Sequence, residues 1–174
     1  MNKKGVTLVE LLGAIIILGL LVAMVATFIG LINNASRIIA LNAKANSEGL
    51  LITKTLEDQM KDFGSTDYSL CVNPDCIILE KHYSNVYDPI TDDIVLTIYN
   101  PALSKRIELL NNQLLINSVP YVIDGMTLHS SSSLSVTESG TSVSIIITIV
   151  LEATEGQLFT FTASHLFNTS SIPS

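Results

Sequence analysis

The chain has 174 residues, of which 48% are hydrophobic and 14% are charged, and its formal net charge is −7. Soluble domains average about 25% charged residues, so this composition excludes an ordinary soluble protein, while its apolar content excludes a disordered one. The acidic balance argues against a nucleic-acid-binding surface, which needs a basic face. The hydrophobicity is concentrated at the N-terminus, which excludes a polytopic membrane protein and leaves one domain with an appendage.

The N-terminal segment contains an apolar run long enough to cross a bilayer. No charged residue occurs in the 22 residues from Leu11 to Ile32, and about 20 residues of helix span a hydrocarbon core of ~30 Å. Lys3 and Lys4 precede the run. The positive-inside rule therefore predicts a single-pass protein with a cytoplasmic N-terminus and its C-terminal domain outside the membrane.

Two general interpretations of this segment are open. A cleaved secretory signal has an apolar core of about 7–15 residues that ends in a small-x-small site. Here the core is longer, and Met24–Ala26 fits such a site poorly. A plain signal anchor explains the lysines and the apolar run but gives Glu10 no task. A carboxylate so close to a membrane helix is costly, which makes it a functional hypothesis by default.

A third interpretation accounts for Glu10. Lys-Lys-Gly followed by Val-Thr-Leu-Val-Glu-Leu-Leu resembles the prepilin signature of type IV pilins and pseudopilins. The resemblance implies that a dedicated membrane peptidase cuts between Gly5 and Val6, and that the new N-terminal amine is methylated. It also implies that Glu10 is the family's glutamate near the new N-terminus. Val6 stands where the family usually has Phe.

The implied cut gives Glu10 a partner. Cleavage leaves an α-amine on Val6, about one helical turn from Glu10. In a packed helical filament, the amine of one subunit can meet the glutamate of its neighbour. Such a pair would set the register, because each charge alone is very unfavourable in an apolar core. Small residues such as Gly13 and Gly19 would let the helices approach closely.

The pattern becomes amphipathic after Ile32, and no proline occurs before Pro74. We predict one helix from about Val6 to about Asp62, ended by Gly64–Ser65, in which Gly49 costs about 1 kcal/mol relative to alanine. The predicted organisation is a leader at 1–5, a transmembrane and polymerisation helix at 6–32, its amphipathic continuation at 33–63 and a β-rich extracytoplasmic head at 64–174.

The head is predicted to be an antiparallel sheet laid on the C-terminal half of the helix, which is an α+β fold. Hairpin turns are expected at Asn111–Gln113 and Thr154–Gln157, and a loop at Ser130–Ser133. The expected strands are 76–83, 94–99, 106–110, 114–117, 121–123, 126–129, 143–152 and 158–163. This strand-rich layout resembles the larger minor pseudopilins.

Cys71 and Cys76 flank a short turn, Asn73–Asp75. Outside the membrane a disulfide across this turn is favoured, and closing so small a loop contributes about 2 kcal/mol of chain entropy. Two free thiols are the alternative. A zinc site needs four ligands and His82 is the only nearby addition, while a redox pair needs Cys-x-x-Cys spacing.

The remaining polar groups point to no chemistry of their own. The acidic loop Asp88–Asp93 could bind Ca²⁺, although a solvated turn is favoured. His82, His129 and His165 are scattered along the chain. No nucleophile, phosphate-binding or metalloprotease motif is present, so we expect no catalytic residues, no metal and no cofactor.

The sequence favours a structural pilin-like subunit, a minor pilin or pseudopilin, used for DNA uptake, protein secretion or adhesion. The resemblance implies as partners the prepilin peptidase, other pilins, a membrane assembly platform with its ATPase, and the lipid bilayer, without direct nucleic acid binding. The expected location is the cell membrane, then the cell surface or a pseudopilus. The alternative is a single-pass surface binding protein that does not polymerise and keeps its N-terminus intact.

Overall fold

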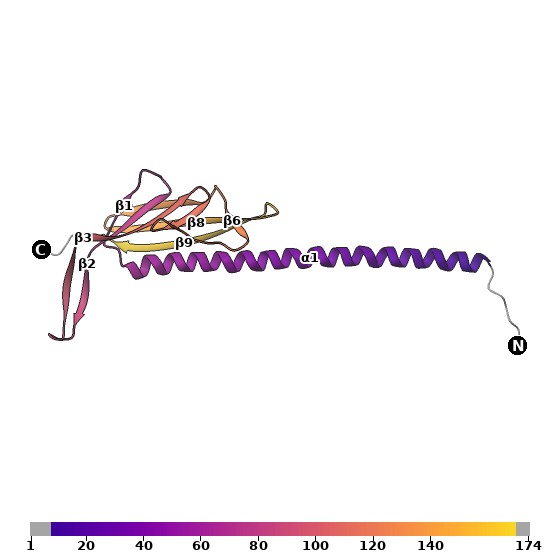
Figure 1. Ribbon diagram of the computed structural model, residues 1–174, viewed down its shortest axis with the longest axis horizontal. Coiled ribbons are helices and arrows are strands. Elements are labelled where there is room, and N and C mark those ends of the chain that lie inside the picture. The colour runs from indigo at the N-terminus through magenta and orange to yellow at the C-terminus, as the bar shows by residue number, and fades with distance from the viewer. Residues whose placement is uncertain (1–7, 170–174) are drawn as a thin grey trace. The chain divides into compact units, whose positions relative to one another are not determined.

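The computed structural model describes residues 8–169, and its first element is a single helix, α1 (Leu8–Phe63), seen in Figure 1. The chain divides into two compact units, Met1–Ala43 and Lys44–Ser174. The first contains the N-terminal part of α1. The second contains the rest of α1 and all strands of the described residues, and from here on the name head refers to this whole unit rather than to 64–174 alone. The predicted long helix is confirmed over the described residues, which do not include Val6.

The head contains two antiparallel sheets, which confirms the predicted α+β class but replaces the single sheet that was expected. The first sheet has the order β1-β2-β3-β4-β5, and in the second β8 pairs with β9 along one edge and with β6 and β7 along the other. The strands of the first sheet are β1 (Asp67–Leu70), β2 (Cys76–Asp88), β3 (Asp93–Leu110), β4 (Gln113–Ile116) and β5 (Val119–Pro120). Those of the second are β6 (Met126–Leu128), β7 (Ser133–Ser139), β8 (Ser142–Ala153) and β9 (Leu158–Asn168).

Strand β3 continues without interruption past Pro101, although the sequence predicted two separate strands, 94–99 and 106–110. β2 pairs with β3 in one register as far as Lys81 opposite Leu103, and in another from Tyr83 opposite Ile98. Pro101 falls in the unpaired stretch between these registers. No ladder hydrogen bond needs its missing N–H there, so the strand continues past a residue that usually ends one.

Other strands also differ from the prediction: β1 was not predicted, and β2 and β9 end at Asp88 and Asn168 rather than at 83 and 163. β7 begins at Ser133 and was not predicted, because its serines and threonines hide the alternation that turns Leu134 inward. The predicted strand at 121–123 is wrong. Asn117 and Ser118 both have positive φ and form a tight turn after β4. Pairing therefore resumes at once in β5, and after a last backbone bond from the Tyr121 N–H to the carbonyl oxygen of Leu114 at 2.7 Å the chain leaves the sheet.

One core joins the C-terminal part of α1 to both sheets. The buried residues of α1 recur every three or four positions, which places them on one face of the helix. These residues are Ala45, Gly49, Ile52, Thr53, Leu56 and Met60. The apolar side chains among them, Ala45, Ile52, Leu56 and Met60, belong to one cluster that also contains Ile77 and Ile107 from the first sheet and Ile145, Ile147 and Ile149 from the second.

Polar contacts add to this packing. The backbone N–H of Ser164 on the edge strand β9 donates to Glu57 Oε1 at 3.3 Å, so the helix provides an acceptor for an amide that an edge strand leaves without one. Lys105 on β3 donates to the carbonyl oxygen of Gln59 at 3.0 Å and to its side-chain oxygen at 2.8 Å. Burial lowers the pKa of Lys105. The helix is thus held by a strand from each sheet.

The two sheets are also linked to each other. The Tyr68 hydroxyl on β1 donates a hydrogen bond to Glu138 Oε1 on β7. This bond raises the pKa of Tyr68 to about 12, because ionisation would remove the donor and place a second negative charge beside the carboxylate. The Tyr68 ring also meets Phe167 edge-on, with 6.3 Å between the ring centroids.

Gly49 is expected to be necessary despite its low helix propensity. A Cβ at this position would occupy the space filled by the Phe161 ring of β9. We predict that Gly49→Ala lowers the free energy of unfolding, because overpacking costs about 1–3 kcal/mol and exceeds the propensity gain of about 1 kcal/mol. Urea unfolding of the detergent-solubilised chain, followed by tyrosine fluorescence, measures this. Ser47→Ala on the exposed face is the control and should raise stability slightly; a rise for Gly49→Ala as well would refute the close approach.

Candidate functional site

The described part of the N-terminal unit is an apolar helix without cover. No residue from Leu8 to Ala43 is buried, and the large apolar side chains from Leu8 to Ile32 are 54–82% exposed. The helix has the length and composition needed to cross a membrane. Apolar surface of this extent requires lipid or other helices around it.

Thr27 is the only polar side chain from Leu11 to Ile32, and its hydroxyl is bonded within the helix. It lies 2.7 Å from the carbonyl oxygen of Met24 and 3.2 Å from that of Ala23. Threonine hydroxyls bond in this way to the preceding turn. The apolar run therefore presents no polar side chain that needs a partner in lipid.

Glu10 is the single charged residue from Leu8 to Ser36. It lies in the first turn of α1 and is exposed. A carboxylate at this end of a helix interacts favourably with the helix dipole. The predicted processing residues Gly5 and Val6 lie outside the described residues, so the structure places Glu10 alone of the three.

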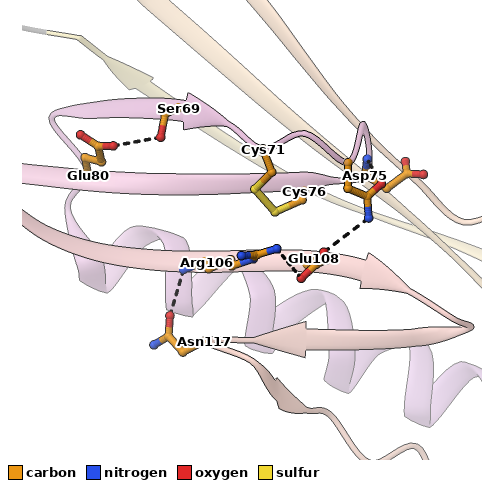
Figure 2. Close-up of a disulfide and its surroundings, with 9 residues drawn as sticks. Ser69, Cys71, Asp75, Cys76, Glu80, Arg106, Glu108 and Asn117 are labelled. Atoms are coloured by element: carbon orange, nitrogen blue, oxygen red, sulfur yellow. Dashed lines mark hydrogen bonds and ion pairs between the residues drawn. A yellow bond between two sulfur atoms is a disulfide. The ribbon is translucent and has the colours of Figure 1, made fainter.

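The second predicted site is a turn closed by a disulfide. Cys71, just after β1, is bonded to Cys76 at the start of β2, and their Cα atoms are 5.4 Å apart (Figure 2). The backbone N–H of Cys71 also donates to the carbonyl oxygen of Cys76 at 3.4 Å. Cys76 is fully buried. The bridge thus anchors the turn Asn73–Asp75 to the core.

Asp75 uses this anchored position to hold both sheets. Its carbonyl oxygen accepts the backbone N–H of Leu109 on β3 at 2.8 Å. Its Oδ1 accepts the backbone N–H of Leu134 on β7 at 3.1 Å. The turn that the disulfide closes is therefore one of the junctions between the two sheets.

A buried carboxylate lies beside the same turn. Glu108 Oε2 is 2.9 Å from Arg106 Nη2 (Figure 2). Glu108 Oε1 accepts a hydrogen bond from Asn73 Nδ2 at 3.4 Å. A buried charge is tolerated when it is paired in this way. Sequence reasoning did not single out this pair, although two opposite charges separated by two positions on a strand lie on one face.

The acidic loop Asp88–Asp93 forms the turn between β2 and β3. Asp88 Oδ1 accepts the backbone N–H of Ile90 at 2.8 Å, and Asp93 Oδ1 accepts that of Ile94 at 2.7 Å. Aspartates commonly stabilise turns by such bonds. Within residues 8–169, no group of three or more His, Cys, Asp or Glu side chains is arranged to hold a metal ion.

The three histidines lie in separate surroundings. His82 Nε2 is 3.3 Å from Glu80 Oε2, and His129 Nδ1 is 2.7 Å from a neighbouring serine hydroxyl. His165 stacks on Phe167 with 5.8 Å between the ring centroids, and burial lowers the pKa of its imidazole. Each histidine thus contacts only its own neighbours, and the three do not form a common site.

We expect the disulfide to stabilise the head by restricting the unfolded chain. Reduction, or replacement by Cys71→Ser with Cys76→Ala, should lower the free energy of unfolding by about 2 kcal/mol. Urea unfolding of the detergent-solubilised chain with and without dithiothreitol measures the difference. Dithiothreitol should leave the double variant unchanged. An unfolding midpoint of the wild-type chain that does not respond to reduction would contradict this role.

Comparison with known proteins identifies the N-terminal segment. Residues 1–26 match a family model described as the prokaryotic N-terminal methylation motif. Neither the curated proteins nor the solved structures gave a match. The matched range contains Gly5, Val6 and Glu10 and much of the uncovered apolar helix. The N-terminal segment of the chain therefore carries the prepilin signature of type IV pilins, and the helix that this signature enters has the length and composition needed to cross a membrane.

Proposed function

We propose that this chain is a structural subunit, a minor pilin or pseudopilin, of a type IV filament system that serves DNA uptake, protein secretion or adhesion. The observation that carries the proposal is the prepilin motif on residues 1–26, which includes much of an apolar helix that the described residues leave uncovered. Its role is assembly rather than catalysis, and it takes no cofactor.

Glu10 selects the position of each subunit in the proposed filament. Prepilin peptidase cuts after Gly5 and leaves a charged α-amine on Val6. When the helix leaves the bilayer, apolar contacts between helices replace contacts with lipid and supply the affinity. The amine of one subunit pairs with Glu10 of a neighbour. A shift in register separates these two charges in an apolar core, which costs several kcal/mol.

The two lysines that precede the apolar run define the proposed orientation. Lys3 and Lys4 stay on the cytoplasmic side, and the head lies outside the membrane, at the cell surface or in a pseudopilus. The disulfide between Cys71 and Cys76 supports this orientation, because disulfides persist in oxidising compartments. The partners are the prepilin peptidase, other pilins, the assembly platform with its ATPase, and the lipid bilayer. The chain's net charge of −7 disfavours direct nucleic acid binding.

The position of the cut is the first test. We predict that the mature chain, made together with prepilin peptidase, begins at Val6, and that Gly5→Leu keeps the leader and stays in the membrane fraction. Mass spectrometry of the N-terminal peptide and fractionation of sheared filaments measure both. A mature chain that begins at Met1 or Asn2 would favour the tethered surface protein instead.

The ion pair is tested separately from the cut. Glu10→Ala should be cut normally but should enter filaments far less efficiently, because the Val6 amine then has no partner in the apolar core. Immunoblots of sheared filaments and of the membrane fraction measure the ratio of assembled to membrane-bound chain. Glu48→Ala, which removes a carboxylate from α1 outside the apolar run, is the matched control. Equal incorporation of Glu10→Ala and the wild-type chain would show that the pair is unnecessary.

A further inference from the structure

The outer half of the β2–β3 hairpin is a two-stranded ribbon. Beyond the register irregularity, Tyr83–Asp88 pairs with Asp93–Ile98. β1 reaches β2 only at Ile77–Glu80, and β4 reaches β3 only at Ile107–Leu110. We call residues Tyr83–Ile98 the arm. Figure 1 shows its two strands extending away from the other strands of the head.

The arm has one apolar face. Side chains alternate between the two faces of a strand, and the register places Tyr83 opposite Ile98 and Tyr87 opposite Ile94. The members of the apolar face are Tyr83, Tyr87, Ile94, Leu96 and Ile98, with Asn85 as the one polar member. The other face is mixed and consists of Ser84, Val86, Asp88, Asp93, Val95 and Thr97.

Most of this apolar face is exposed in the single chain, and only Tyr83 and Leu96 are half-buried. Tyr87 is 59% exposed, Ile94 67% and Ile98 55%. An isolated two-stranded hairpin is marginally stable in water, and a contiguous exposed apolar patch marks an interaction surface. A ribbon whose strands carry their most exposed apolar side chains, Tyr87, Ile94 and Ile98, on one face is therefore expected to pack against a partner.

The charge of the arm restricts that partner. Its charged residues are Asp88, Asp92 and Asp93, and no Lys, Arg or His occurs from Tyr83 to Ser104. Anionic lipid and nucleic acid attract basic segments, so an acidic arm disfavours both. The partner should combine an apolar surface with positive charge.

The α1 segment Asn33–Ala43 has this combination. Arg37 is the only charged residue of this segment, and Lys44, just beyond it, is paired with Asp124 at 2.8 Å. Ile39 is 67% exposed and Ile38 is 39% exposed, and no residue of the segment is buried. It is also the part of α1 that follows the uncharged run, so it continues the surface through which other pilins would assemble.

We propose that the apolar face of the arm packs against α1 residues Asn33–Ala43 of a second copy of this chain. The acidic turn of the arm then lies near Arg37 of that copy, where unlike charges favour one docking orientation. This inference rests on the proposed function, because assembly is what brings two copies together. It adds a contact made by the head to the contacts made between helices.

Photo-crosslinking in the assembled state tests the contact. The full chain carries benzoylphenylalanine in place of Tyr87, on the apolar face, or in place of Val86, on the mixed face. Each is made with prepilin peptidase and the assembly machinery, in a mixture of isotopically light and heavy copies. We expect Tyr87 to crosslink to a peptide within residues 33–43, with light joined to heavy, at about tenfold the yield from Val86.

A second pair of variants tests the same face without a probe at its centre. Ile94→Asn should lower the yield of the Tyr87 crosslink several-fold, because it removes apolar area from the contact. Val95→Asn, on the mixed face, should leave the yield unchanged. Crosslinks to lipid, to another protein or within one molecule, or equal yields from Tyr87 and Val86, would overturn the proposal.

The two proposals fail in different ways. A chain that keeps its leader and never enters filaments refutes the proposed function. A chain that is cut after Gly5, and whose incorporation depends on Glu10, but whose Tyr87 does not crosslink to residues 33–43 of another copy, refutes only the docking of the arm.

Discussion

The absence of charged side chains decides where the first half of α1 can lie. From Leu11 to Ser36 the helix carries no ionised group, and its apolar side chains are exposed on all sides. Transfer of that surface to water costs roughly 25 cal/mol for each Å², so the segment must lie in lipid or among other helices. Glu10 lies at the edge of this segment. Among its residues, only Glu10 carries a charge whose free energy differs between lipid and a bundle of helices that supplies a cation.

The sequence was most informative where one physical rule dominates a long segment. A charge-free run, a helical period without proline and a lysine-glycine leader predicted α1 and the prepilin motif without tertiary information. Prediction was poorer where pairing decides the structure. Pro101 can lie within β3 only because a register shift removes the need for its N–H, and β7 is a strand because β8 supplies its hydrogen bonds. Neither partner is visible from the local residues.

The disulfide turn shows how a predicted feature acquires a role that spacing alone did not suggest. The sequence predicted a disulfide between Cys71 and Cys76 across a turn. The structure adds that Asp75 in this turn accepts hydrogen bonds from Leu109 and Leu134, which lie on different sheets. The contact with Leu134 joins residues 59 positions apart in the sequence, so it depends on how the strands are arranged in the fold. The necessity of Gly49 is similar, since only the position of Phe161 reveals it.

The buried stripe of α1 has a mechanical consequence. Within the head, the residues that fasten the helix to the sheets, from Ala45 to Met60, are spread along several consecutive turns. A tensile load along the helix axis would act on these contacts in shear, so all of them share the load and must rupture together. Peeling, in which contacts break one after another, would need a force across the axis. Separation of α1 from the sheets is therefore resisted most strongly when the subunit is pulled along its helix axis.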